Sequence, residues 1–217
     1  EEQAGFRKGY STIDHVYTLF SMINNCLNGK RKSKFYVAFI DYQKAFDFVD
    51  RDKLWSVLQK IKTSTKMLKM LKGMYNSVQA CVRSGAETSD FFECPAGVKQ
   101  GCLLSPLIFS LLITDVADRV TGSGKHGYQF LPGLRKIFLL LFADDIALLS
   151  VTPSGLQNQI DQLQKASDSL GLTINLQKTK IMVFRKGGHL SKHEKWYYKG
   201  EEIEIVNSYK YLGFTLD

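Results

Sequence analysis

Apolar residues recur along the chain at two spacings, one typical of helices and one typical of strands. Helical spacing, in which apolar residues lie three or four positions apart, appears in several stretches that begin or end at a capping residue. Asp50 precedes one such stretch and Gly171 follows another. The expected helices span residues 12–27, 50–61, 66–74, 105–120 and 152–170.

Two of these helices are expected to pack in different ways. The first carries one apolar face, which should contact the protein interior and consists of Ile13, Val16, Tyr17, Phe20, Ile23 and Leu27. The helix at 105–120 begins with Ser105-Pro106, where the serine hydroxyl can accept from a free amide and proline loses no hydrogen bond. Since residues 107–120 are apolar on most faces, this helix should lie inside the protein.

Apolar runs of strand length lie between the expected helices. Residues 35–40 are rich in aromatic and β-branched side chains, as in a buried strand. Further strands are expected at 80–83 paired with 91–93, at 137–150 as two strands joined through Ala143-Asp144-Asp145, and at 172–176, 181–184, 202–206 and 209–216. This order favours an α+β fold in which helices pack on one side of a mainly antiparallel sheet.

Charge adds a preference for a polyanionic partner. The chain has 29 Lys and Arg against 21 Asp and Glu, which gives a net charge of +8. Such a surplus favours nucleic acid, although a basic surface that only faces water fits the composition equally well. Its four cysteines lack metal-binding spacing, so we expect reduced, mostly buried thiols. Apolar runs too short for a membrane span, no signal peptide and no initiator Met indicate a soluble piece of a longer polypeptide.

Asp144 and Asp145 interrupt a stretch that is otherwise apolar on both sides. Burying a carboxylate costs several kcal/mol unless a cation compensates. An isolated pair is explained more simply by a turn that faces water, since Asp is common in turns. Asp41 changes this balance because it ends a second buried strand. If the two strand ends are neighbours in one sheet, Asp41 and Asp144 can share a pair of metal ions.

Paired metal ions would suit phosphoryl transfer. Mg²⁺ is the expected ion, because it prefers oxygen ligands and is usually shared between carboxylates and substrate phosphates. One ion lowers the pKa of the attacking hydroxyl, while the other stabilises the leaving oxygen and binds the triphosphate. Asp47 and Asp50 follow Asp41 closely, but they are better explained as an acid at a helix start and a helix cap.

Five segments resemble, in order, the conserved motifs A to E of reverse transcriptases. They are FIDYQKAFD at 39–47, GVKQGCLLSP at 97–106, FADD at 142–145, LGLTINLQKTK at 170–180 and YKYLG at 209–213. The FADD form, the AFD after Asp41 and the opening QAGFRKG at 3–9 are similar to the non-LTR (LINE-type) retrotransposon branch in particular.

This resemblance implies an RNA-directed DNA polymerase that extends a DNA primer with dNTPs on an RNA template. Residues 1–217 would form the palm and part of the fingers, with the first finger motifs and the thumb elsewhere in a parent polyprotein. The protein would work in the nucleus or in a cytoplasmic ribonucleoprotein. A catalytically inactive remnant that still binds nucleic acid is the alternative, and a structural domain or an RNA-directed RNA polymerase fits the motifs less well.

The resemblance also assigns roles to single residues. It makes Asp41, Asp144 and Asp145 the ligands of two Mg²⁺ ions, with Mn²⁺ as a substitute, and the main chain at Tyr42 adds a carbonyl. Phe46 falls where the family has an aromatic ring that crowds the sugar 2′-position and admits deoxyribose. By itself, Phe46 would be read as an ordinary core aromatic.

Gln100 and Gly101 match the positions that approach the incoming nucleotide and the template. Lys178 matches the lysine proposed to protonate the leaving pyrophosphate. Lys180 is a close rival, and a solvated lysine at a strand end is an equally good explanation.

Tyr211, Leu212 and Gly213 resemble the hairpin that grips the primer; taken alone, they would be a turn with two packed side chains. Basic residues in segments 30–34, 60–72 and 185–199 are expected to contact phosphates. Residues 196–198 could stack on bases, but packing within the protein explains these aromatics better.

Overall fold

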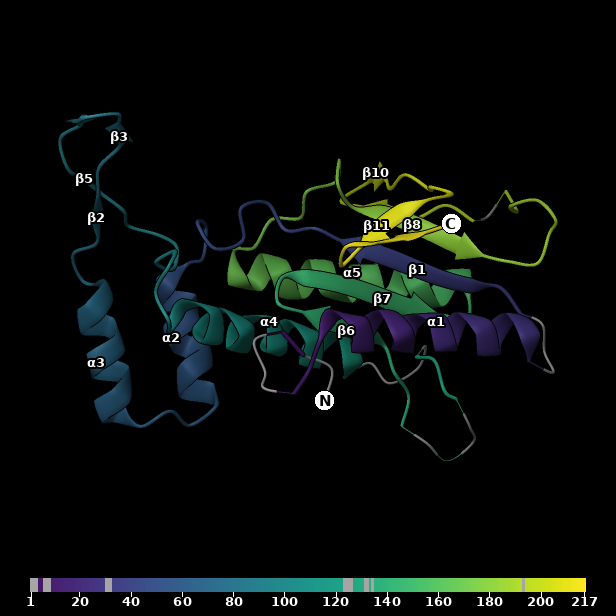
Figure 1. Ribbon diagram of the computed structural model, residues 1–217. Helices are drawn as coiled ribbons and strands as arrows, with labels where there is room; N and C mark the ends of the chain where they lie inside the picture. Colours follow the sequence, from purple (N-terminus) through teal and green to yellow (C-terminus); the bar gives the residue numbers. More distant parts are fainter. Residues whose placement is uncertain are drawn as a thin grey trace.

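A four-stranded antiparallel sheet forms the centre of the computed structural model, with strand order β6-β7-β1-β8 (Figure 1). The strands are β1 (Phe35–Ile40), β6 (Leu139–Phe142), β7 (Asp145–Ser150) and β8 (Lys180–Phe184). They confirm the strands expected at 35–40, 137–150 and 181–184. The structure describes residues 4–5, 9–29, 33–122, 127–130, 133, 135–192 and 194–217. Most of the QAGFRKG opening and the basic residues 30–32 lie outside that set.

β1 lies inside the sheet, and all six of its residues are buried. Its side chains alternate between two cores, because successive residues of a strand point to opposite faces. Tyr36, Ala38 and Ile40 belong to one core, and Phe35, Val37 and Phe39 belong to the other. The sheet is therefore covered on both faces.

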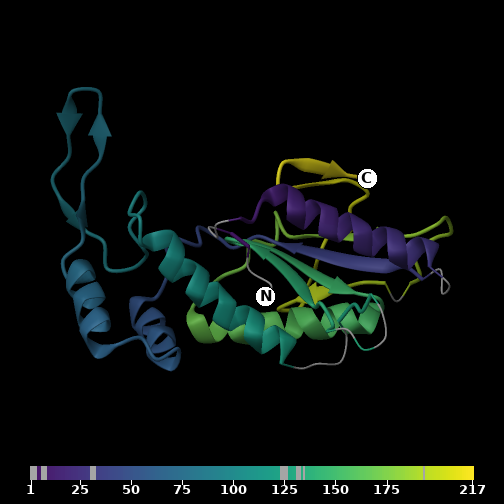
Figure 2. The same ribbon diagram turned by 60° about the horizontal axis from the view of Figure 1, so that its bottom comes forward.

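The larger core lies under α4 (Ser105–Thr121) and α5 (Pro153–Leu170), with α2 (Arg51–Lys60) beside α4 (Figure 2). Most of α4 is buried, as expected from its apolar surface. Ser105 does not cap this helix: it is already helical, and its hydroxyl lies 3.1 Å from the Tyr75 hydroxyl. The caps expected at Asp50, Thr152 and Gly171 are confirmed.

The opposite face is covered by α1 (Thr12–Asn28) and by the hairpin of β11 (Tyr209–Tyr211) and β12 (Phe214–Leu216) (Figure 2). The predicted fold had helices on one side of the sheet only, so this second layer is an addition to it. A strand such as β1, which is apolar on both faces, must be covered on both. The packing face predicted for α1 is half right: Ile23 is buried and Val16 and Leu27 pack partly buried against this core, but Ile13, Tyr17 and Phe20 are exposed. The fully buried residues of α1 are His15, Leu19, Met22, Ile23 and Cys26. Two apolar stripes run along this helix, and periodicity cannot choose between them.

A protruding arm follows α2 in the chain (Figure 1). It consists of α3 (Thr65–Tyr75) and two short paired ladders, β2 (Gln79–Ala80) with β5 (Phe92–Glu93) and β3 (Arg83–Ser84) with β4 (Glu87–Thr88). The hairpin expected at 80–83 and 91–93 is confirmed by the pairing of Ala80 with Phe92.

The strand expected at 172–176 is wrong. Ile174 makes only a single bridge, to Tyr42, and the chain then turns because the Asn175 side chain accepts from the Gln177 and Lys178 amides. The strand expected at 202–206 is limited to the end of β10 (Glu201–Glu202), which pairs with β9 (Tyr197–Tyr198), and a bridge at Ile205.

All four cysteines are free, as expected, but only Cys26 is buried; Cys81, Cys94 and Cys102 are partly exposed. Within the described residues, no helix is both long and apolar enough to cross a membrane.

Candidate active site

The ends of two neighbouring strands bring the acidic residues together. β1 and β7 are antiparallel, and their last pair before the edge is Ile40 with Ile146. Asp41 follows Ile40 directly and Asp145 precedes Ile146 directly, so both carboxylates emerge at the same edge of the sheet. The condition set by the sequence, that the two strand ends are neighbours, is met.

Asp144 lies in a tight turn between β6 and β7. Phe142 pairs with Asp145, which leaves Ala143 and Asp144 as the two turn residues. Ala143 has a φ of 59°, a left-handed conformation that costs a residue with a side chain roughly 1–2 kcal/mol. Packing compensates, since Ala143 is buried and Phe142 contacts the His15 ring edge to face. The turn leaves both aspartates exposed to solvent.

The carboxylates lie close enough to act on one another electrostatically, and the pKa values of Asp145 and Asp41 are raised. The pKa of Asp145 is raised to about 6 by loss of hydration and by the charges of Asp144 and Asp41. The pKa of Asp41 is also raised, by burial and by Asp144, although the positive charge of Lys178 opposes the shift. This edge of the sheet therefore holds more negative charge than its surroundings neutralise.

The donor set is suited to a divalent cation that also binds substrate. It offers only carboxylate oxygens, which Mg²⁺ and Mn²⁺ prefer. Across the described ranges, however, no three His, Cys, Asp or Glu side chains are gathered closely enough to enclose an ion by themselves. The unneutralised charge fits a cation whose coordination is completed by substrate phosphates, as is usual for Mg²⁺.

The segment before β8 holds Asp41 from the other side. The Asn175 amide donates to the Asp41 carbonyl at 2.8 Å, and the Asp41 amide donates to the buried Thr179 hydroxyl at 3.2 Å. The bridge between Tyr42 and Ile174 is bonded through the carbonyl of Asp41 and the amide of Gln43, so both of its bonds bypass the Tyr42 carbonyl.

The two candidate lysines have different surroundings. Lys178 is exposed beside the Asn175 turn, and its charge acts on Asp41. The Lys180 ammonium lies 2.5 Å from Glu204 Oε2, in an ion pair. The structure therefore brings Lys178, rather than Lys180, into electrostatic contact with the carboxylates.

Phe46 and Gln100 lie in segments that are bonded to each other. The Phe46 ring stacks on Phe109 of α4 with centroids 4.3 Å apart, and the Phe46 carbonyl accepts from the Val98 amide at 2.8 Å. The Gln100 side-chain amide donates to Asp47 Oδ1 at 2.7 Å. Gly101 has a φ of 79° and no neighbour within 4 Å of a Cβ built on it, so a left-handed backbone, rather than crowding, favours glycine there.

The β11–β12 hairpin packs close to the acidic residues. Leu212 and Gly213 form its turn, both with positive φ. Tyr209 stacks on Phe39 at 4.3 Å and Tyr211 lies 5.1 Å from the same ring. The pKa of Tyr209 is raised to about 12 by burial and by the charges of Asp145 and Asp41. The hairpin therefore lies within electrostatic range of these carboxylates.

Three of the described basic residues in segments 30–34 and 185–199 are paired with acids of the protein itself. Lys34 bonds both oxygens of the buried Glu194, Lys195 bonds Glu202 and Lys199 bonds Asp168. Trp196 is fully buried and donates to the Pro153 carbonyl, which confirms packing rather than base stacking for this residue.

Sequence reasoning missed Tyr209 and Arg51, which both contact segments of the site. Tyr209 and Tyr211 are two positions apart in one expected strand and so share a face, which could have indicated that both tyrosines contact the same part of the protein. Arg51 begins α2, where a cation opposes the helix dipole, and a residue against that preference often has a tertiary partner.

Comparison with known proteins identifies the family. The model of the family described as "Reverse transcriptase (RNA-dependent DNA polymerase)" matches residues 1–216. The chain belongs to this family. Reverse transcriptases generally use divalent metal ions, which agrees with the acidic edge of the sheet in this one.

Two relatives place this reverse transcriptase among retrotransposon proteins. It is 27% identical over 186 residues to the "Retrovirus-related Pol polyprotein from type-1 retrotransposable element R2" of Nasonia vitripennis, covering 82% of this chain and 18% of the relative. It is 30% identical over 223 residues to the "Probable RNA-directed DNA polymerase from transposon BS" of Drosophila melanogaster, covering 100% of this chain and 24% of the relative. The resemblance to the non-LTR branch is confirmed.

A solved structure supports the fold. Telomerase from Candida tropicalis, in complex with a fragment of telomeric RNA, matches with a TM-score of 0.62 at 15% identity and covers 93% of this reverse transcriptase chain and 32% of its own. At that identity the match shows the fold alone, and it confirms the α+β palm class. The chain thus spans about a third of that structure, and less of the curated relatives.

Proposed function

We propose that this chain forms the palm and part of the fingers of an RNA-directed DNA polymerase from a non-LTR retrotransposon. It extends a primer 3′-hydroxyl with dNTPs on an RNA template. The observation that carries the proposal is the meeting of Asp41 with the Asp144-Asp145 turn at adjacent strand ends, in a chain of the reverse transcriptase family.

Asp41, Asp144 and Asp145 are the proposed ligands of two divalent ions, which we take to be Mg²⁺ with Mn²⁺ as a substitute. When bound, such ions supply positive charge to the triphosphate and make the attacking hydroxyl more acidic. The chain's own part is to hold the carboxylates at one edge, through the β1–β7 pairing and the bonds of Asn175 and Thr179 to Asp41. The Tyr42 carbonyl, which the neighbouring bridge bypasses, is a further proposed ligand.

Three residues are proposed to contact the incoming nucleotide. Phe46 would exclude a ribose 2′-hydroxyl with a ring that its stacking on Phe109 holds in place. Gln100 and Gly101 would face the nucleotide and template from the neighbouring loop, where Gln100 is exposed and bonded to Asp47.

Lys178 is proposed to give a proton to the leaving pyrophosphate. Its exposed side chain and its electrostatic contact with Asp41 support this role over Lys180, whose ammonium is paired with Glu204. The turn at Leu212-Gly213 and the adjacent Tyr211 are proposed to hold the primer end, because their hairpin packs next to the carboxylates.

The protruding arm supplies a surface for the nucleic-acid backbone. From residue 61 to 75 the chain contains no Asp or Glu, and its lysines are Lys62, Lys66, Lys69 and Lys72. All four are exposed, and none forms an ion pair with the part of the protein that the structure describes. A surface of this kind makes sequence-independent phosphate contacts, which suits an RNA template paired with DNA.

Primer extension tests the proposal most simply. The chain within its parent polypeptide is given an RNA template, a DNA primer, dNTPs and Mg²⁺, and wild type is compared with Asp144→Ala. Loss of the ligand should lower the rate by roughly 10³-fold, which is about 4 kcal/mol of transition-state stabilisation. Glu201→Ala is the matched control, because it removes an exposed acid in β10 that belongs neither to the proposed site nor to the arm. An inactive wild type, or equal rates for Asp144→Ala and wild type, would contradict the proposal.

A further inference from the structure

Arg51 is the first residue of α2, the helix that follows the turn at residues 43–47. A cation at this end of a helix is disfavoured by the helix dipole, and Asp52 beside it shows the usual preference for an acid. Contacts between Arg51 and other parts of the protein must therefore offset the unfavourable interaction of its charge with the helix dipole.

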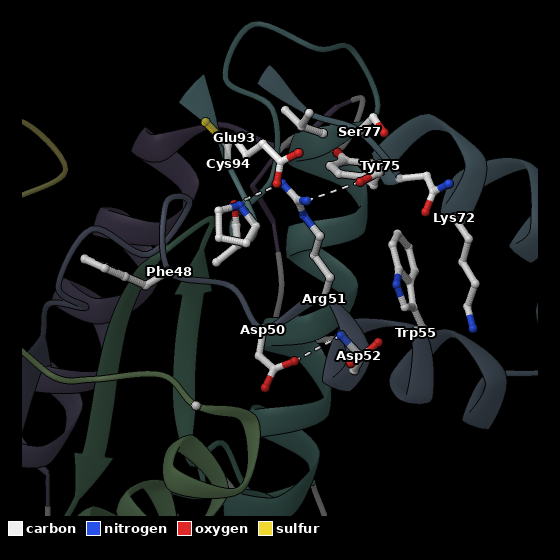
Figure 3. Close-up of a pocket in the computed structure, with 15 residues that line it drawn as sticks. Phe48, Asp50, Arg51, Asp52, Trp55, Lys72, Tyr75, Ser77, Glu93 and Cys94 are labelled. Carbon is white, nitrogen blue, oxygen red and sulfur yellow. Dashed lines mark hydrogen bonds between the residues drawn. The ribbon is translucent and has the colours of Figure 1, made fainter. Parts of the chain in front are cut away.

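The guanidinium of Arg51 bonds three main-chain carbonyls. Nε donates to Gly97 at 2.9 Å, Nη2 to Ala96 at 3.0 Å and Nη1 to Tyr75 at 3.2 Å. It also lies over the Tyr75 ring, 5.2 Å from the centroid. Figure 3 shows this side chain reaching from α2 toward Tyr75, with the hydrogen bonds at its guanidinium end. Arg51 thus joins the start of α2, the end of α3 and the loop at 96–97.

The same loop is bonded to the segment that carries Phe46. The Val98 amide donates to the Phe46 carbonyl and the Gly97 amide donates to the Val49 carbonyl, both at 2.8 Å. Gly97 has a φ of 81°, and a Cβ there would lie 2.6 Å from the Asp47 carbonyl oxygen. Only glycine permits this approach. The loop at 96–98 is therefore bonded to the segment at 46–49 and packed tightly against it.

We propose that Arg51 is a positioning residue for nucleotide selection. By holding the 96–98 loop against the 46–49 segment, it fixes the placement of Phe46 and of Gln100, which follows the loop and bonds Asp47. Arg51 does not touch the nucleotide. This inference rests on the proposed function, since Phe46 and Gln100 matter here only if the chain selects dNTPs.

The geometry explains why neither alanine nor lysine replaces this arginine. A lysine ammonium is a compact point charge and cannot span three carbonyls as the planar, forked guanidinium does. Tyr75 and Ala96 line an open pocket of about 740 Å³, and Gly97 lines an adjoining one of about 940 Å³. Water can therefore hydrate the three carbonyls that alanine leaves without a partner, and the fold is retained. The expected defect is a displaced loop rather than an unfolded chain.

Kinetics in the parent polypeptide separate positioning from a loss of folded protein. For Arg51→Ala we expect kcat/KM for dNTP to fall by about 10- to 100-fold, mainly through a higher KM, and the preference for dNTP over rNTP to narrow by about tenfold. Arg51→Lys should recover only part of this loss. Fewer folded molecules would instead lower the apparent kcat for both nucleotides equally and leave KM and the preference unchanged; that result would overturn the proposal.

Hydrogen exchange in the 217-residue chain tests whether Arg51 holds the 96–98 loop in place, a restraint that we call the clamp, and it does not require catalytic activity. Arg51→Ala should speed exchange at the Gly97 and Val98 amides and leave β1 unchanged. Arg83→Ala is the matched control, because among the described residues the Arg83 side chain bonds only the nearby Gly85 carbonyl on the exposed arm. Unchanged exchange at Val98 would overturn the clamp. An inactive wild type would refute the proposed function and the role in nucleotide selection, while exchange would still decide whether the clamp exists.

Discussion

Replacing Phe46 by valine tests the proposed sugar gate, and the structure allows its two effects to be worked out separately. Removing a fully buried Phe side chain costs about 3–5 kcal/mol. Phe46 is only partly buried and valine keeps part of the side chain, so we expect about 1–2 kcal/mol, including about 0.5–1 kcal/mol from lost stacking on Phe109. The gate itself should be worth about 1–3 kcal/mol, or roughly 10–100-fold in preference for dNTP over rNTP.

The assay measures kcat/KM for a dNTP and for the matching rNTP in primer extension, and urea unfolding gives the stability. Phe46→Tyr is the control, because it keeps a ring of the same size and should retain both stacking and discrimination. Phe46→Val should lose discrimination by admitting rNTP, with dNTP incorporation nearly unchanged. If Phe46→Val loses stability as expected but discriminates as well as wild type, Phe46 is a core aromatic and the gate assignment is refuted.

Three further predictions follow from other contacts. Burial raises the pKa of Asp115, but hydrogen bonds from Lys60 and Arg119 outweigh it and hold that pKa below its usual value. The stabilisation by the charged Asp115 side chain is therefore present at neutral pH and lost as pH falls through its folded-state pKa. Asp115→Asn should lower the free energy of unfolding by about 1–2 kcal/mol at pH 7 and by less at pH 3. An equal loss at both pH values would contradict this. Lys178→Ala should slow single-turnover extension far more than Lys180→Ala, and equal slowing would remove the assignment. Replacing Lys62, Lys66, Lys69 and Lys72 by glutamine should reduce the slope of log affinity for an RNA–DNA duplex against log salt by up to about 3.6, because each phosphate contact contributes about 0.9; an unchanged slope would exclude these lysines as phosphate contacts.

Much of the fold was predictable because its signals are local. β1 and the β6–β7 hairpin are continuous apolar runs, and Asp50 and Thr152 cap their helices through amides only two or three residues away. The packing face of α1 was predicted only in part, because the choice between its two apolar stripes depends on the sheet beneath it. That information lies in residues far away in the sequence.

The residues of the candidate site could be predicted from the sequence, but the long-range contacts that bring them together could not. Asp41 and Asp145 are more than 100 positions apart, and their meeting depends on β1 pairing with β7, which no local pattern specifies. The choice between Lys178 and Lys180 depends on Glu204, an exposed acid with no distinguishing sequence feature. The contacts of Arg51 are to main-chain carbonyls, which the identity of the side chains does not reveal.

The carboxylates at the adjacent ends of β1 and β7 are the proposed ligands of two divalent ions. Mn²⁺ binding measured by electron paramagnetic resonance tests this assignment directly, with the parent polypeptide, primer-template and dNTP all present. The double variant Asp41→Asn with Asp144→Asn keeps the shape of both side chains and removes their charge, and Asp90→Asn serves as the control for charge alone. We predict that wild type and Asp90→Asn bind two Mn²⁺ ions more than the nucleic acid and dNTP alone, and that the double variant loses them. Equal Mn²⁺ binding by the double variant and wild type would contradict the account.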